Sequence, residues 1–344
     1  MIMQMKFRSY ILAFLALVPI VFTSCHKDDD DDVLEYLSGK LTFPLPGYAT
    51  CDYTKSFLVD TLSTLAKKDG GSVGYYFRNG LLLEVDTVKY ENQAKARPFT
   101  VRLKDTVGTF SFTLAGFAKD YYGSTQSVSV TVVKAGYGKG HSLTGFDIKD
   151  SDEIMQDPRD ERSYYVTTIG NTRWMRSNLA WNGSGIPFKK YEAMNDVYGR
   201  YYNWEEAKTA CPENWTLPSD SDWCELAGAL GAGAKPGEGF DGIAGKLMED
   251  IYFNSSKMWP FTREVKIDNS ARFSAMPVGY ATKEGSDYVF EDNLMYSMFW
   301  CSDADSYGHA LCRYIYGRQN YVYSGARDTK EFYASVRCIQ KINK

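Results

Sequence analysis

Apolar and polar side chains alternate along much of the segment from residue 33 to residue 134, and no long helical pattern appears there. A period of two is typical of β-strands that bury one face. Turn residues such as Asp69-Gly70-Gly71 and Asn79-Gly80 separate the alternating runs. Several short strands at this spacing predict a small β-sandwich, with strands at residues 40–43, 73–77, 81–88, 99–103, 109–114 and 127–133.

Two short helices are predicted later in the chain, at residues 204–210 and 221–230, with a Leu217-Pro218 turn between them. Either Ser219 or Asp220 is expected to cap the second helix, and Asp222 adds favourable charge to its first turn. The stretch before this region is rich in glycine and acidic residues and has little apolar periodicity. We therefore expect a linker at residues 135–155 and a second domain at residues 156–342.

Residues 1–24 have the three parts of a secretory signal peptide: a short basic region, an apolar run at residues 10–22, and small residues before Cys25. The apolar run is shorter than the roughly 20 residues that span a bilayer, so we expect it to be removed. Phe22-Thr23-Ser24-Cys25 resembles the lipobox of bacterial lipoproteins. That resemblance implies a membrane anchor through lipid on Cys25. The alternative is an ordinary signal peptide with a chance cysteine at its end.

Residues 25–32 contain a block of like charge, Asp28 to Asp32, which has to stay solvated and extended. Its simplest interpretation is a tether that lifts the folded part off the membrane. Lys27 with these aspartates also resembles the export signal of Bacteroidetes surface lipoproteins. That resemblance implies the outer face of the outer membrane, and the periplasmic face is the alternative.

Composition excludes some partners and favours others. The formal net charge of −4 argues against nucleic acid. Aromatic residues make up 15% of the chain, including 26 tyrosines, which suits strands and recognition surfaces. Seven cysteines leave six beside Cys25, and an even number in an exported chain favours disulfides. Without a CxxC motif, and with three histidines, we expect no metal site built on cysteine.

The second domain resembles the Fibrobacter succinogenes major paralogous domain family over nearly its whole length. The matching motifs follow one another in the family's order: Asp157-Pro158-Arg159-Asp160, Ile169-Gly170-Asn171, Trp174-Met175, Asn178-Leu179, Tyr198-Gly199-Arg200-Tyr201-Tyr202-Asn203-Trp204, Cys211-Pro212, Leu217-Pro218, Pro277-Val278-Gly279-Tyr280, Phe299-Trp300 and Ser335-Val336-Arg337-Cys338. This resemblance implies an α+β domain of the C-type-lectin-like fold. Five tryptophans in these and neighbouring motifs are expected in its core: Trp174, Trp204, Trp215, Trp223 and Trp300.

The first domain has a weaker resemblance, over about a third of its length. Asp105-Thr106-Val107-Gly108-Thr109-Phe110 and the valine-rich strand after it resemble the late strands of PKD-like or immunoglobulin-like modules. The expected architecture is therefore multidomain: an N-terminal all-β Ig/PKD-like sandwich at residues 33–134, followed by the α+β C-type-lectin-like domain. A spacer is the expected role of the sandwich.

The lectin-like resemblance also implies a disulfide between Cys211 and Cys338, which would tie the first helix to the last strand. Cys301 and Cys312 flank an expected hairpin and are candidates to pair across it. Cys51 and Cys224 are left over, and a bond between them that joins the two domains is a guess.

Enzymatic readings find little support. No Gly-x-Ser-x-Gly elbow or HExxH motif is present. The formylglycine-generating branch of the fold uses late cysteines for redox chemistry, which would nominate Cys301 and Cys312, but these stand eleven residues apart within expected strands. No cofactor is expected. Lectin calcium motifs such as Glu-Pro-Asn are missing. Asp303 and Asp305 offer alternating oxygen ligands that a hard cation such as calcium could use, but a solvated loop is the favoured interpretation.

Binding through a surface is the favoured function. The chain from Asp303 to Tyr333 is dense in Tyr and Arg, which anchor many interfaces. The expected ligand contacts are Asp303, Tyr307, Tyr314, Tyr316, Arg318 and Tyr321. Packing inside a half-buried sheet is the alternative for each tyrosine. The expected partner is an extracellular protein or glycan. A structural envelope component without a discrete ligand is the second reading, and a modifying enzyme is the third.

Overall fold

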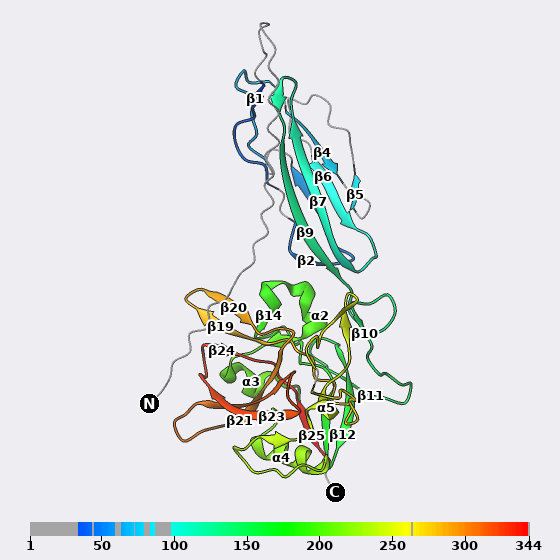
Figure 1. Ribbon diagram of the computed structural model, residues 1–344, viewed down its shortest axis with the longest axis vertical. Coiled ribbons are helices and arrows are strands. Elements are labelled where there is room, and N and C mark those ends of the chain that lie inside the picture. Colours follow the sequence, from blue (N-terminus) through cyan, green and yellow to red (C-terminus); the bar gives the residue numbers. More distant parts are fainter. Residues whose placement is uncertain are drawn as a thin grey trace.

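The computed structural model describes residues 34–42, 45–58, 63–71, 73–78, 83–86, 98–262 and 264–342. The signal peptide, Cys25 and the acidic tether lie outside these residues. The described chain is rich in β-strands and forms two units that lie end to end (Figure 1). No helix among the described residues is long and apolar enough to cross a membrane.

The N-terminal unit contains two main sheets that share one hydrophobic core, together with a parallel pair of two-residue strands, β1 and β8. Strand order is β2-β9-β7-β4 in one sheet and β3-β6-β5 in the other. The core includes Val101, Phe112 and Val130, which alternate with more exposed neighbours as the period-two pattern predicts, and Leu114. The strands of this unit are β1 (Glu35–Tyr36), β2 (Tyr48–Thr50), β3 (Thr54–Leu58), β4 (Gly74–Arg78), β5 (Leu83–Asp86), β6 (Pro98–Leu103), β7 (Gly108–Phe117), β8 (Tyr121–Tyr122) and β9 (Ser124–Val133).

The expected strands at 73–77, 81–88, 99–103, 109–114 and 127–133 correspond to β4, β5, β6, β7 and β9. The expected strand at 40–43 is wrong over its described part, because Leu41 makes only an isolated bridge to Ser63. The alternation of residues 40–43 is too short for a ladder. The strands β2 and β3, which lack clear alternation, and the two-residue strands β1 and β8 were not predicted.

The C-terminal unit contains five small sheets, with strand orders β10-β17-β18, β11-β12-β13-β25, β14-β15, β16-β23-β22-β21 and β20-β19-β24. Its first strands are β10 (Leu143–Thr144), β11 (Glu153–Gln156), β12 (Ser163–Ile169), β13 (Thr172–Met175), β14 (Ile186–Pro187), β15 (Arg200–Tyr201), β16 (Phe240–Asp241), β17 (Tyr252–Phe253) and β18 (Ser256–Lys257). The later ones are β19 (Tyr280–Glu284), β20 (Asp287–Glu291), β21 (Tyr296–Ala304), β22 (Ala310–Tyr316), β23 (Tyr321–Arg327), β24 (Phe332–Tyr333) and β25 (Ile339–Lys341).

Two capped helices pack beside the late sheet. α3 (Trp204–Ala210) and α4 (Asp220–Ala229) lie close to the expected helices. Both begin with a capping box, formed by Asn203 with Glu206 in α3 and by Ser219 with Asp222 in α4. Ser219, not Asp220, is therefore the cap of the second helix. The shorter helices are η1 (Phe188–Lys190), η2 (Glu192–Met194), α2 (Asn195–Tyr198) and α5 (Ala244–Leu247).

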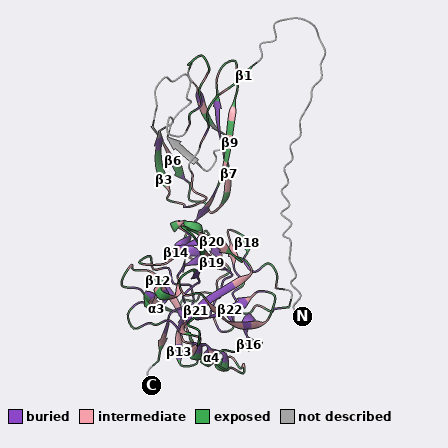
Figure 2. Cartoon of the chain, turned by 90° about the vertical axis from the view of Figure 1, so that its left-hand side faces the viewer, coloured by how far each residue is buried: buried purple, intermediate pink, exposed green. Residues whose placement is uncertain are grey.

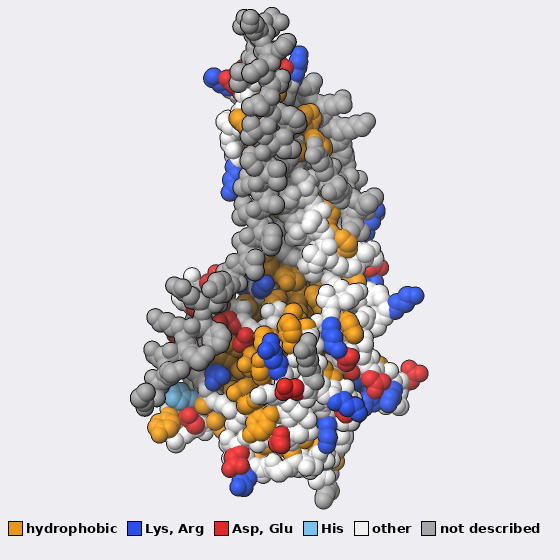
Figure 3. Space-filling view, viewed as in Figure 1, with side chains coloured by type: hydrophobic (Ala, Val, Ile, Leu, Met, Phe, Trp, Pro, Cys, Tyr) orange, Lys and Arg blue, Asp and Glu red, His pale blue; other side chains and the backbone are white. Residues whose placement is uncertain are grey.

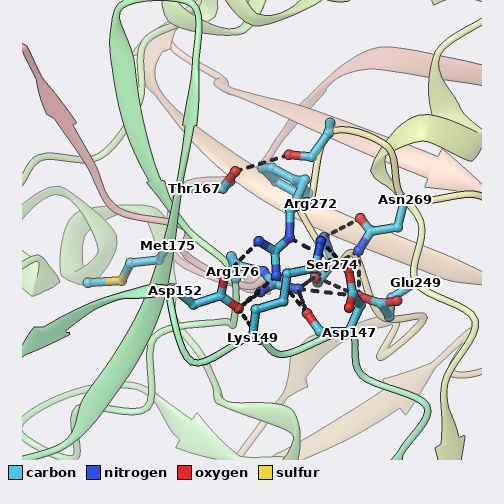
Figure 4. A network of polar contacts seen from close by, with 12 residues as sticks. Asp147, Lys149, Asp152, Thr167, Met175, Arg176, Glu249, Asn269, Arg272 and Ser274 are labelled. Atoms are coloured by element: carbon cyan, nitrogen blue, oxygen red, sulfur yellow. Dashed lines mark hydrogen bonds and ion pairs between the residues drawn. The ribbon is translucent and has the colours of Figure 1, made fainter.

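Residues 135–155, expected as a linker, contain two strands that pair inside the C-terminal unit. β10 pairs with β17, and β11 pairs with β12. Asp152 accepts hydrogen bonds from Arg176 at 2.9 Å and from Arg272 at 2.7 Å, and the Asp147 carbonyl accepts one from Arg176 at 2.7 Å (Figure 4). The acidic residues that suggested a solvated linker are thus partners of buried or half-buried arginines.

The two units meet through aromatic packing. The ring of Tyr48 on β2 lies 5.3 Å from the ring of Tyr191 and 6.0 Å, edge to face, from that of Phe188. The Asn254 side chain donates to the Val132 carbonyl at 3.2 Å. Val133, the last residue of β9, is buried in a core cluster of the C-terminal unit. The two units therefore share a packed joint.

Candidate functional site

The late sheet β16-β23-β22-β21 separates two core clusters of the C-terminal unit. Its strands carry many buried residues (Figure 2). One face contributes Phe299, Cys301, Ile315 and Val322 to the cluster that holds Trp174 and Trp223. The other face contributes Met298, Trp300 and Cys312 to a second cluster. Both faces of this sheet are therefore buried at its centre.

This arrangement corrects the expected pairing of Cys301 with Cys312. Cys312 lies opposite Trp300 in the antiparallel register, so Cys301, one residue further, points to the other face of the sheet. Both thiols are buried and form no disulfide. Cys51 and Cys224 are half-buried and also form no disulfide. The guessed bond between Cys51 and Cys224 is thus also wrong. The Cys211–Cys338 disulfide is present, with Cα atoms 5.7 Å apart.

Five tyrosines occupy the end of the Trp300 face where the sheet leaves the core. We call them the tyrosine face: Tyr296, Tyr314, Tyr316, Tyr321 and Tyr323. Tyr296 pairs with Tyr316, and Tyr314 pairs with Tyr323, so strand alternation places all five on one side. Each is half-buried. The face is contiguous and is made by three strands.

The rings of the tyrosine face stack on one another across the strands. The Tyr296 and Tyr316 rings are 4.9 Å apart at 19°, and the Tyr314 and Tyr323 rings are 4.9 Å apart at 10°. The Tyr321 and Tyr323 rings meet at 4.7 Å and 64°. Neighbouring tyrosine rings cover the flat faces of one another. A ligand would therefore contact mainly the edges and the hydroxyl groups of these rings.

Burial raises the pKa of Tyr296, Tyr314 and Tyr323. For Tyr296, the Asp292 carboxylate adds to this effect. The ordinary pKa of tyrosine is already near 10, so these phenols are neutral at physiological pH. Each hydroxyl can therefore donate and accept a hydrogen bond.

A groove opens at one end of the tyrosine face. It has a volume of about 720 Å³ and is lined by Pro260, Phe261, Glu264, Tyr316, Arg318 and Gln319. Arg318 belongs to the turn between β22 and β23, and its guanidinium lies 5.3 Å above the centre of the half-exposed Phe261 ring. The groove thus joins an aromatic surface, a cation and polar groups at one place.

Arg313 fixes the sheet beneath the tyrosine face. Its buried guanidinium donates to the Asp220 carboxylate from Nε at 2.7 Å and lies 4.2 Å above the Phe240 ring. Asp220 begins α4, so this pair holds β22 to the helix. A buried charge that is both paired and hydrogen-bonded favours one fixed geometry, and the tyrosines above it are positioned accordingly.

The six expected ligand contacts divide into three groups: four residues at the tyrosine face, Tyr307 in a loop, and Asp303 beside the start of α4. Tyr314, Tyr316 and Tyr321 lie on the tyrosine face, and Arg318 lies at its end beside the groove. Tyr307 is 85% exposed in the β21–β22 loop, at the opposite end of the sheet.

Asp303 accepts a hydrogen bond from the backbone N–H of Asp220 at the start of α4, so it is engaged in structure. Asp305 accepts from the backbone N–H groups of Tyr307 and His309 and turns its own loop. The described residues contain no group of three or more His, Cys, Asp or Glu side chains that could hold a metal ion.

Three further residues belong to the site and were not among the expected contacts: Tyr296, Tyr323 and Phe261. Tyr323 could have been found from Tyr321, because residues two apart on a strand share a face. Tyr296 and Phe261 come from other segments and meet this site only through the register of β21 and the packing of the β22–β23 turn.

Burial raises the pKa of the Cys312 thiol to about 11 and that of Cys301 well above its ordinary value. A thiolate is the reactive form of cysteine. These two thiols are thus protonated and enclosed at neutral pH.

The surface on the side seen in Figure 3 intersperses hydrophobic and charged side chains, without a large area of one charge.

The fold and this face define a β-rich, two-unit protein whose candidate site is an aromatic sheet surface. The family model of the Fibrobacter succinogenes major domain matches residues 167–340, half of the chain. The chain belongs to this family.

Two other comparisons add little. A search of curated proteins finds no match. Among solved structures, the adhesin InvE of Yersinia pseudotuberculosis is similar over 88% of this chain and 98% of that chain, at 12% identity and a TM-score of 0.26. A similarity at that TM-score carries no argument about fold or function.

Proposed function

We propose that the protein is a cell-surface lipoprotein that binds an extracellular protein or glycan, without catalysis, through the tyrosine face and the adjoining groove. The observation that carries the proposal is the gathering of five half-buried tyrosines on one side of β21, β22 and β23. Rigid aromatic side chains supply contact area and polar tips at little entropic cost. A face built only for packing would bury these rings fully, as it does Trp300.

The proposal also includes a finer assignment of the fold of each unit. An immunoglobulin-like N-terminal unit agrees with the two sheets around one core. A C-type-lectin-like C-terminal unit agrees with α3, α4, the late sheet and the Cys211–Cys338 disulfide that ties the end of α3 to the last strands. In this proposal the N-terminal unit is a spacer, and the packed joint keeps the tyrosine face away from the membrane.

The membrane anchor in this proposal is lipid on Cys25, with the outer face of the outer membrane as the location. Its support is the sequence of residues 1–32. Labelling cells with an alkyne-tagged palmitate would detect the lipid, and a Cys25→Ser variant should lose the label. Protease treatment of intact cells should cleave the protein, whereas full protection would place it on the periplasmic side.

Binding can be tested with the chain from residue 33 onward on arrays of glycans and extracellular matrix proteins. A saturable signal is expected, and it should be lost in a Tyr316→Ala, Arg318→Ala variant. The matched control is Tyr36→Ala, Tyr122→Ala, which removes another stacked and exposed tyrosine pair, 4.8 Å apart, on the N-terminal unit. Silence of folded protein on both arrays, or equal loss in the control, would contradict the proposal.

A further inference from the structure

The tyrosine face is flanked by two arginines that have no acidic partner among the described residues. Arg318 lies in the turn at one end, and Arg327 lies at the far end of β23, opposite Ala310. The seven residues of β23 from Tyr321 to Arg327 span roughly 20 Å at the rise of a strand. Alternation places Arg327 on the same side of the sheet as Tyr323, and a Cβ added at Gly325 would lie 3.6 Å from its guanidinium.

These two arginines differ from the other described arginines of the C-terminal unit. Arg337 is enclosed by carbonyl oxygens and the Asn178 side chain. Seven others form ion pairs with carboxylates, namely Arg159, Arg162, Arg173, Arg176, Arg200, Arg272 and Arg313. Among the described residues, no carboxylate lies within ion-pair distance of Arg318 or Arg327. Of the described arginines of this unit, Arg318 and Arg327 thus remain without a carboxylate partner, and both lie beside the tyrosine face.

Both guanidiniums are held over aromatic rings instead. Arg318 lies 5.3 Å above Phe261, and Arg327 lies 5.4 Å above Phe332. Arg327 also donates to the Ala326 carbonyl at 2.9 Å, which leaves further N–H groups of its fork for another acceptor. A guanidinium supported in this way is preorganised to pair with a carboxylate in a bidentate manner.

The stacked rings between the arginines indicate which kind of molecule would carry that carboxylate. Sugars pack their C–H faces on open aromatic faces, but the Tyr314 and Tyr323 rings cover each other at 10°. Ring edges carry partial positive charge and the hydroxyl groups donate and accept. Peptide groups and acidic side chains match these features.

We propose that the ligand of the tyrosine face is an acidic polypeptide surface, with carboxylates that pair with Arg318 and Arg327 at opposite ends of that face. This inference rests on the proposed function and specifies its partner. Glu264, on the wall of the groove, opposes such a ligand locally and limits its affinity.

The test is binding of poly-L-glutamate to the full chain in detergent, measured by biolayer interferometry. We expect saturable binding that weakens with added salt. Arg318→Gln and Arg327→Gln should each weaken it by about three- to tenfold, because exposed charge pairs contribute modest energies, and Glu264→Gln should tighten it. Arg102→Gln is the matched control, since Arg102 is an exposed arginine of the N-terminal unit and forms no ion pair with any described side chain.

Three results would overturn the inference: no binding of poly-L-glutamate, equal weakening by Arg102→Gln, or binding of polygalacturonate as tight as that of poly-L-glutamate. The last result would identify an acidic polysaccharide. Each is distinguishable from failure of the proposed function, because the array signal that depends on Tyr316 and Arg318 would persist when only the acidic-polypeptide inference fails.

Discussion

The ring of Tyr314 on β22 lies parallel to the ring of Tyr323 on β23, with centroids 4.9 Å apart. The two residues are direct partners in the antiparallel register, and both are half-buried. Their stacking joins the two strands at the centre of the tyrosine face. It also gives each ring a fixed orientation before any ligand arrives.

We expect this pair to be energetically coupled. Tyr314→Ala and Tyr323→Ala should each destabilise the fold, and the double variant should lose less than the sum by about 0.5–1.5 kcal/mol, the range for aromatic pairs. Urea unfolding of the four proteins measures the difference. Strict additivity would show that the rings only share a surface and do not stabilise each other.

The cysteine assignments can be checked by peptide mapping without reduction. One disulfide-linked peptide pair is expected, containing Cys211 and Cys338, while Cys51, Cys224, Cys301 and Cys312 should be alkylated after denaturation. A Cys211→Ala, Cys338→Ala variant should lose about 2–5 kcal/mol of stability. Cys301→Ala, Cys312→Ala serves as the control for losing two sulfurs, and a linked Cys301–Cys312 peptide would contradict the register of β21 and β22.

Acid should weaken the start of α4 through Asp222. Burial tends to raise the pKa of this carboxyl, but hydrogen bonds from Lys341 and Ser219 outweigh it and hold the pKa below its ordinary value of 3.8. A carboxyl with a lowered folded-state pKa stabilises the fold above its unfolded pKa, and this contribution is lost as the pH falls through the folded value.

Asp222→Asn should therefore cost about 1 kcal/mol near neutral pH and less below pH 3.8. Thermal unfolding of both proteins between pH 7 and pH 3 measures the difference. A cost that does not change with pH would show that the capping geometry, not the charge, is what stabilises the helix. Glu205→Gln is the control, because Glu205 also lies in the first turn of a helix, α3, but is not part of its capping box.

The joint between the two units should loosen when Tyr48 is shortened. Tyr48→Ala removes the ring that contacts Phe188 and Tyr191, and we expect a loss of roughly 1–3 kcal/mol, because the ring is only partly buried. Limited proteolysis should then cut faster around residues 134–142, whereas Tyr36→Ala, at an exposed strand of the N-terminal unit, should leave this rate unchanged. Equal rates in all three proteins would show that the Tyr48 contacts do not restrain the joint.

Local patterns were sufficient for elements that depend on nearby residues. The alternation of residues 109–114 and 127–133 predicted parts of β7 and β9, whose outward hydroxyls, such as Ser111 and Ser129, bond to each other across the strands. Asp222 was recognised from its charge as favourable in the first turn of α4, and the structure adds that it closes a capping box with Ser219. The family motifs also placed the Cys211–Cys338 bond.

Tertiary structure decided what depends on register and on distant partners. Sequence brought Cys301 and Cys312 into one hairpin, but the side on which each thiol lies follows from the pairing of Cys312 with Trp300, and a shift of one residue would reverse it. The sequence assigned Asp152 to a linker, but in the fold Arg272, 120 residues later, lies within hydrogen-bond distance of its carboxylate. The density of tyrosines in the sequence could not decide whether their side chains pack inside the sheet or face a ligand. By itself, the sequence determined that this chain has strands rich in tyrosine. Only the folded sheet decided that five of those side chains share the tyrosine face, because strand pairing brings together residues that are distant in the sequence.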